Sequence, residues 1–215
     1  ESDVLINGLS NSMYLAVITV LIGMPLSVVT GYALARYKIK FKNLIISFIL
    51  MTIVIPVFTT IIPIYSFFME HSMLDSMLWT SVIFISAFIP LNIWIIMNYF
   101  RDLPEDLWEA AAIEGANERQ LFFQIGLPLA KPIILTSSLI IFLMSWKQYI
   151  IPMLLLSSHN NKVLTLIMSE FMTRDAINYS VIAMSGIIVI IPPLLASIIF
   201  RKNLVSGLTA GSVKE

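Results

Sequence analysis

The sequence contains no cysteine and very little charge. The absence of cysteine excludes disulfides and thiolate metal sites. Only 12% of the 215 residues are charged, whereas an average globular chain carries roughly 25%. A phosphate-binding loop of the Walker A type requires a Gly-Lys pair, and none of the 8 glycines is followed by lysine. The chain therefore does not bind ATP through such a loop.

Hydrophobic residues make up 58% of the chain, and its mean hydropathy is +0.90. A helix that crosses a bilayer needs roughly 20 apolar residues. Apolar segments of this length predict five membrane spans, at about 11–35, 43–68, 78–100, 132–156 and 179–200. We expect helices because lipid leaves the open edge of a sheet without hydrogen-bond partners. The sequence therefore predicts an all-α polytopic membrane protein with a single transmembrane domain over residues 1–215.

Lysine and arginine are distributed unevenly between the predicted loops. Ten of the 13 cations fall in segments 36–43, 101–131 and 201–215, whereas the opposite loops hold only Lys162 and Arg174. Loops on the cytoplasmic side carry the excess of cations. We therefore predict a cytoplasmic loop at 102–131, a cytoplasmic tail at 201–215 and an external loop at 157–178, in which 163–172 could form a short surface helix. The net charge of zero gives no support for nucleic acid as a partner.

Carboxylates are absent from all five predicted spans. This argues against a carrier that couples transport to protons or sodium ions through intramembrane acids. The sequence also lacks a zinc-protease HExxH motif and a nucleophile elbow, so no catalytic residue is predicted. His71 and His159 lie in separate polar loops, and their spacing does not predict a metal site.

The longest polar interruption of the chain is the loop at 102–131. Asp102 and Asn117 are each followed three residues later by Glu or Gln, which predicts two capping boxes and hence two short helices. Gly115 predicts the end of the first helix, because glycine adopts a left-handed conformation without steric cost. The residues leave two interpretations open. The loop is either a solvated hairpin between spans or a docking surface, on which small side chains and one glutamate meet a partner.

The spacing in this loop resembles the EAA loop of ABC-importer permeases. It reads Glu109-Ala110-Ala111, three residues, Gly115, nine residues, then Ile125-Gly126-Leu127-Pro128. The segments Ser145-Trp146-Lys147-Gln148-Tyr149 and 204–214 are similar to the carbohydrate branch, in particular to the second, smaller permease of maltose-type heterodimers. The resemblance covers essentially the whole chain. It implies a type I ABC-importer transmembrane domain, of which an N-terminal sixth span is expected to be missing.

The resemblance also implies partners. A second permease would form the alternating-access pathway for a sugar or oligosaccharide in a prokaryotic cell membrane. Two cytoplasmic ATPase subunits would bind ATP and magnesium, so this non-catalytic chain needs no cofactor of its own. An extracytoplasmic binding protein would deliver the solute and contact the loop at 157–178. The residues implied to dock the ATPase are Glu109, Ala110, Ala111, Gly115, Ile125, Leu127 and Pro128, and those implied to reach it from the tail are Gly207, Leu208, Thr209, Gly211 and Lys214.

Lys147 is the charged residue within a predicted span. Such a charge faces a bundle interior or a watery path, or else its long side chain extends to the membrane interface. Its neighbours combine flat rings with hydrogen-bonding groups, which is the mixture that a sugar needs. The candidate pathway residues are Trp146, Lys147, Gln148, Tyr149, Asn92 and Asn98.

Two other functions compete with this interpretation. One is an ABC permease for an amino acid, a peptide or an anion. The other is a secondary carrier or channel that works alone, for which inverted repeats and intramembrane carboxylates would be the signature.

Overall fold

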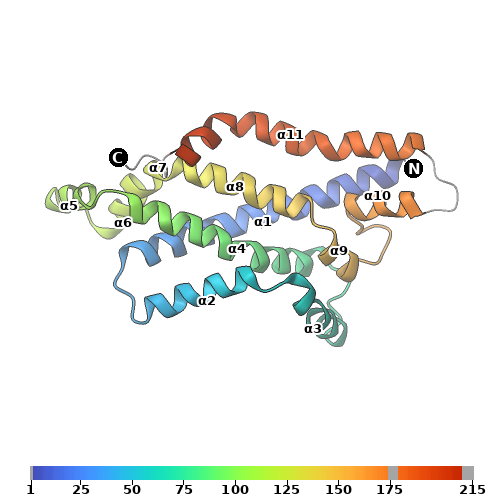
Figure 1. The fold of residues 1–215 in the computed structure, drawn as a ribbon, viewed down its shortest axis with the longest axis horizontal. Helices are drawn as coiled ribbons and strands as arrows, with labels where there is room; N and C mark the ends of the chain where they lie inside the picture. The colour runs from blue at the N-terminus through green and yellow to red at the C-terminus, as the bar shows by residue number, and fades with distance from the viewer. Residues whose placement is uncertain (1, 174–178, 210–215) are drawn as a thin grey trace.

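The computed structural model describes residues 2–173 and 179–209, and every regular element in this part of the chain is a helix. Figure 1 shows an elongated bundle whose long helices run side by side along its longest axis. One end carries α5, α6 and α7, and the other carries α3, α9 and α10. The elements in chain order are α1 (Ser2–Arg36), α2 (Lys42–Val54), α3 (Val57–Glu70), α4 (Met77–Asp102), α5 (Glu105–Ile113), α6 (Glu118–Gln120), η1 (Leu121–Gly126, π-helical), α7 (Leu127–Leu129), α8 (Lys131–Trp146), α9 (Ile150–Leu155), α10 (Leu164–Thr173) and α11 (Tyr179–Thr209).

Three helices in the described part of the chain, α1, α4 and α11, contain segments long and apolar enough to cross a membrane. The number rises to five if each of two bent helix pairs counts as one span. These pairs are α2 with α3, bent by 92°, and the segment Glu118–Leu129 with α8, bent by 69°. The helical prediction is confirmed, whereas the number of spans stays between three and five.

Two predicted spans are not single helices, and this corrects the expectation for 43–68 and 132–156. Between α2 and α3, Ile55 is extended (φ −64°, ψ 119°), as residues before proline usually are. Pro56 follows and has no N–H to continue the helix. Between α8 and α9, residues 147–149 leave the helix. A third predicted boundary also differs from the structure. α11 continues to Thr209 and so includes residues 201–209 of the predicted tail.

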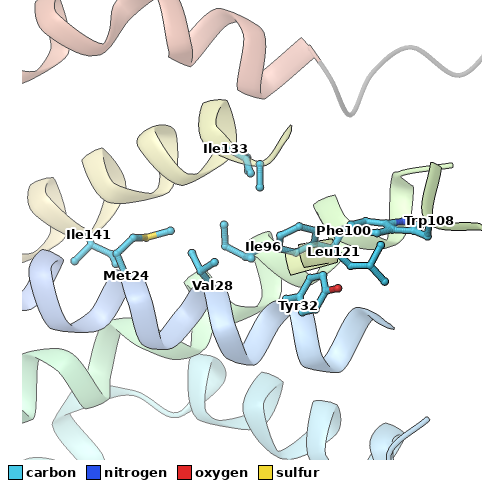
Figure 2. Close-up of a cluster of buried hydrophobic side chains, with 10 residues drawn as sticks. Met24, Val28, Tyr32, Ile96, Phe100, Trp108, Leu121, Ile133 and Ile141 are labelled. Carbon is cyan, nitrogen blue, oxygen red and sulfur yellow. The ribbon is translucent and has the colours of Figure 1, made fainter. Parts of the chain in front are cut away.

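The core is built around α1, which packs along α4 and α8. Gly31 permits the close approach of α1 and α4, because an added Cβ would lie 2.8 Å from Ile96 Cγ2 and 3.0 Å from the Met97 nitrogen. Small residues play this role between membrane helices in general. Figure 2 shows the buried cluster that results, which extends along α1 from Met24 to Tyr32 and on to Trp108.

Contacts between loops distinguish the two ends of the bundle. At one end the Arg36 guanidinium donates to Glu105 over 2.8 Å. At the other end the Asp75 carboxylate accepts from the backbone N–H groups of Ser157 (3.1 Å) and Ser158 (3.0 Å). Burial alone would raise the pKa of Asp75, but these hydrogen bonds outweigh it and lower the pKa. The cation-rich segments 36–43 and 101–131 thus share one end, opposite the loops that contain Asp75 and 157–161.

Candidate functional site

The polar loop begins differently from the prediction. Asp102 is the last residue of α4, and α5 starts after Pro104, which makes no side-chain capping bond. The predicted capping box between Asp102 and Glu105 is therefore wrong. The physical reason is the proline, which forces Leu103 into an extended conformation (φ −70°, ψ 135°) and separates α5 from Asp102.

Gly115 ends α5 as predicted. Its φ is +87°. The N–H of Gly115 donates to the carbonyl of Ala112, and the N–H of Ala116 donates to that of Ala111, both over 3.0 Å. This pair of bonds is the Schellman motif, which satisfies carbonyls at a helix end. Within the described ranges, no atom beyond the two chain neighbours lies within 4 Å of a Cβ added at Gly115, so backbone conformation and not space requires glycine here.

The second half of the loop starts with the predicted capping box. The Gln120 N–H donates to Asn117 Oδ1 over 3.0 Å, and the Asn117 N–H donates to Gln120 Oε1 over 2.8 Å. The regular helix is short, however, because η1 follows directly. Its first residue, Leu121, and its last, Gly126, are buried. The π-helical segment thus brings both residues against the bundle.

A buried tryptophan anchors the loop to the bundle. Trp108 is only 2% exposed although α5 lies at the end of the molecule. Tyr32 of α1 meets it edge-on at a centroid distance of 5.9 Å, and Figure 2 shows both side chains at one end of the buried cluster. Gly126 fits closely beside them, because an added Cβ would lie 3.3 Å from Trp108 Cη2 and 3.4 Å from Tyr32 Cε2. The close approach of the Trp108 and Tyr32 rings therefore explains why position 126 of the EAA-like loop is glycine.

Polar side chains at the C-terminal end of α1 hold the loop from outside the aromatic cluster. Arg36 lies over the Trp108 ring, 4.5 Å from its centroid, and also bonds Glu105. The Tyr37 hydroxyl donates to Glu118 Oε2 over 2.8 Å, and this hydrogen bond raises the pKa of Tyr37 to about 12. Sequence reasoning missed these contacts. The available signal was the lone tryptophan in the polar loop at 102–131.

The seven predicted docking residues divide between two faces of the loop. Glu109, Ala110, Gly115 and Pro128 are exposed, whereas Ala111, Ile125 and Leu127 pack against the buried cluster. The exposed part of the loop also carries large apolar side chains that were not predicted, and the two most exposed are Ile113 (86%) and Phe123 (61%). The arrangement is a projection anchored by Trp108, with small, apolar and acidic groups on its outer face.

Two candidate pathway residues, Trp146 and Asn92, are buried within the helical bundle. The Trp146 indole donates to the carbonyl of Val189 over 3.1 Å and thus ties α8 to α11. Asn92 is fully buried, and its amide donates to the carbonyl of Phe88 one turn earlier over 2.9 Å. Asn92 Oδ1 is buried without a hydrogen-bond partner among the described residues, and Trp146 borders an open pocket beside α11. Pathway roles for Trp146 and Asn92 stay predictions.

Lys147, Gln148 and Tyr149 form the break between α8 and α9. Lys147 is exposed and borders an open pocket next to α11. The carbonyl of Gln148 accepts from the Thr165 hydroxyl over 2.9 Å, and the Tyr149 hydroxyl lies 3.3 Å from that of Ser169. The break is therefore held against α10. Pathway roles for these three residues, and for the half-buried Asn98, stay predictions.

A further cavity lies beside the break between α2 and α3. Its volume is about 390 Å³, and it is open to the outside. The lining is mostly apolar, with three hydroxyl side chains from Thr52, Thr60 and Ser86. Sequence reasoning missed these residues, because hydroxyls inside apolar spans carry no distinctive spacing.

Two predicted regions are only partly described. α10 confirms the predicted helix within the loop at 157–178, whereas residues 174–178 lie outside the described residues. Gly207, Leu208 and Thr209 belong to the last turns of α11, and Gly211 and Lys214 lie outside the described residues.

Comparison with known proteins shows similarity to membrane components of transport systems. Residues 9–209 match the family described as "Binding-protein-dependent transport system inner membrane component". The permease AraQ for arabinooligosaccharides from Halalkalibacterium halodurans is 28% identical over 95% of this chain and 72% of its own length. The diacetylchitobiose permease NgcG from Streptomyces coelicolor is 26% identical over 95% of this chain and 68% of its own.

The fold has a solved counterpart. A bacterial ABC transporter that imports the polysaccharide alginate contains a chain that superposes with a TM-score of 0.70 at 20% identity, over 98% of this chain and 76% of that one. At this identity the likeness concerns the fold. Because the family match extends over nearly the whole chain, the protein belongs to the family of inner membrane components of binding-protein-dependent transport systems.

Proposed function

We propose that this chain is the permease subunit of an ATP-driven ABC importer for a sugar or oligosaccharide. The family match and the sugar permeases among its relatives support this proposal. The observation that carries it is the outer face of α5, where Glu109, Ala110 and Ile113 are exposed on a helix that the buried Trp108 anchors to the bundle. Such a face is suited to a partner's cleft, because small side chains permit close approach and the carboxylate can pair with a cation.

The proposed mechanism transmits ATPase closure through this loop. α5 follows directly from α4 and leads through η1 and α7 into α8. Movement of α5 therefore pulls on both helices. The breaks at Pro56 and at 147–149 provide positions where the outer parts of the bundle can change direction. The pathway itself would form with a second permease, and the exposed apolar side chains of α2 and α11 provide surface for that subunit and for lipid.

ATP-dependent transport is the direct test. We would purify the chain with its partner permease, the ATPase subunits and the binding protein, reconstitute them in liposomes, and measure ATP hydrolysis and uptake of labelled sugars. We expect hydrolysis to rise when the loaded binding protein is added. Glu109→Lys should release the ATPase subunits, because it reverses the charge on the docking face, whereas Glu109→Gln preserves the shape and should retain them.

The other outcomes identify the competing functions. Stimulation by amino acids, peptides or anions in place of sugars would identify a permease for a different solute. Uptake by the purified chain without any ATPase would identify a secondary carrier and contradict the proposal.

We also propose that the end of the bundle with Arg36, α5 and α6 faces the cytoplasm, because cations concentrate there. The chain has no cysteine, so single cysteines can be placed at two exposed positions. His159→Cys should react with a membrane-impermeant thiol reagent in intact cells. Glu114→Cys should react only after the membrane is permeabilised. The reverse pattern would contradict the orientation.

A further inference from the structure

We propose that α1 acts as a strut that links the external segment at 160–164 to the loop at 102–131. The two contacts at its ends, which we call the outer clamp and the inner clamp, are assigned a positioning role. The outer clamp comprises Asn11 and Ser12, and the inner clamp comprises Arg36 and Tyr37. This inference rests on the proposed function, in which a binding protein acts at the external side and ATPases act at the loop.

The outer clamp fixes the start of α10. The Asn11 amide donates to the carbonyls of Asn160 (2.7 Å) and Lys162 (3.0 Å). The buried Ser12 hydroxyl accepts from the N–H of Leu164 over 2.9 Å. Leu164 is the first residue of α10, and the first N–H groups of a helix have no partner within it. Ser12 of α1 therefore caps α10, although the two residues joined lie 152 positions apart in the sequence.

Packing reinforces the outer clamp. An added Cβ at Gly8 would lie 2.3 Å from Ile167 Cδ1 and 3.3 Å from the Leu164 backbone. Glycine thus lets α10 lie directly on the backbone of α1. Together with the hydrogen bonds, this contact means that a shift of α10 must be accompanied by a shift of α1.

The inner clamp joins α1 to both halves of the loop through consecutive residues. Arg36 contacts the first half through Glu105 and the Trp108 ring. Tyr37 contacts the second half through Glu118. The guanidinium side chain is only 20% exposed, against 67% for Glu105. The sheltered part of the inner clamp is therefore the contact of Arg36 with the Trp108 ring, whereas the ion pair with Glu105 is open to solvent on the Glu105 side.

The continuity of α1 makes it suited to transmission. α1 continues through Pro25 as one helix of 35 residues, and the clamps lie roughly 38 Å apart at about 1.5 Å per residue. The chain connections of the loop run through α4 and α8, so its link to α1 consists of side-chain contacts alone. The route through α8 is interrupted at 147–149 before it reaches α10. α1 bypasses that break, and its tight packing against α4 at Gly31 stiffens it.

ATP hydrolysis in the reconstituted complex tests the strut. Basal hydrolysis and hydrolysis with the loaded binding protein would be measured for Asn11→Ala, Arg36→Gln and the double variant. We expect each single variant to assemble, keep its basal rate and lose about fivefold in stimulation, which corresponds to the net contribution of one ordinary hydrogen bond. The double variant should lose no more stimulation than the more impaired of the two single variants, because both changes interrupt the same element.

Matched controls separate transmission from general damage. Asn7→Ala removes an exposed asparagine one turn before Asn11, and Lys38→Gln removes an exposed cation two residues after Arg36. Both should behave like the wild type. The exchanged pair Arg36→Glu with Glu105→Arg should recover stimulation that Arg36→Glu alone loses.

Two results would overturn the strut. One is wild-type stimulation in both single variants, and the other is a double variant whose loss is the product of the two single losses, since independent ends would multiply. A wild-type complex that loaded binding protein does not stimulate at all would instead contradict the proposed function, and with it the inference that depends on it.

Discussion

Replacement of Gly115 by valine should abolish solute-stimulated ATP hydrolysis, whereas replacement by asparagine should preserve most of it. The φ of +87° at this position costs an ordinary L-residue roughly 1–2 kcal/mol, and a β-branched residue is an outlier there. Valine should therefore break the Schellman motif and redirect the outer face of α5. Asparagine tolerates the left-handed region and serves as the matched control.

The measurement is the amount of ATPase that co-purifies with each variant, together with its stimulated hydrolysis. Apart from its chain neighbours, no described residue lies within 4 Å of a Cβ added at Gly115, so membrane insertion and the helical bundle should be unaffected. If the valine variant docks and hydrolyses like the wild type, the direction of α5 is unimportant and the loop is a passive connector.

Replacement of Trp108 by alanine should strongly destabilise the end of the bundle that carries the loop. Substitutions of buried large aromatic residues by alanine typically cost about 3–5 kcal/mol. This side chain is 2% exposed and contacts Tyr32, Gly126 and Arg36. We expect a lower midpoint of thermal unfolding for the purified permease and faster proteolysis between residues 102 and 131.

Trp108→Phe is the matched control for this prediction. The Trp108 indole nitrogen is buried without a hydrogen-bond partner among the described residues, so phenylalanine gives up volume and no hydrogen bond. The phenylalanine variant should remain close to the wild type in stability. An alanine variant that unfolds and is cleaved like the wild type would show that the loop is held by other contacts.

Most of the fold class and part of the site could be predicted from the sequence. Long apolar segments predict membrane helices because backbone groups in lipid must be satisfied within the segment itself. The Schellman end at Gly115 and the capping box at Asn117 were predicted correctly as well. Each of these features depends on hydrogen bonds between residues three to five positions apart, which a short stretch of sequence contains.

Features that depend on distant contacts were decided only by the tertiary structure. The inner clamp joins residues 69 positions apart and the outer clamp joins residues 149 apart, and neither partner carries a local signal for the other. For the same reason the spacing could not divide the loop residues between an exposed face with Glu109 and a buried face with Ile125. The burial of Asn92 and Trp146 follows from the packing of helices that are separate in sequence. Sequence thus determined the helical class and the helix boundaries at Gly115 and Asn117, whereas the packing of α1 against α4, α5 and α10 determined which side chains are buried and which are exposed.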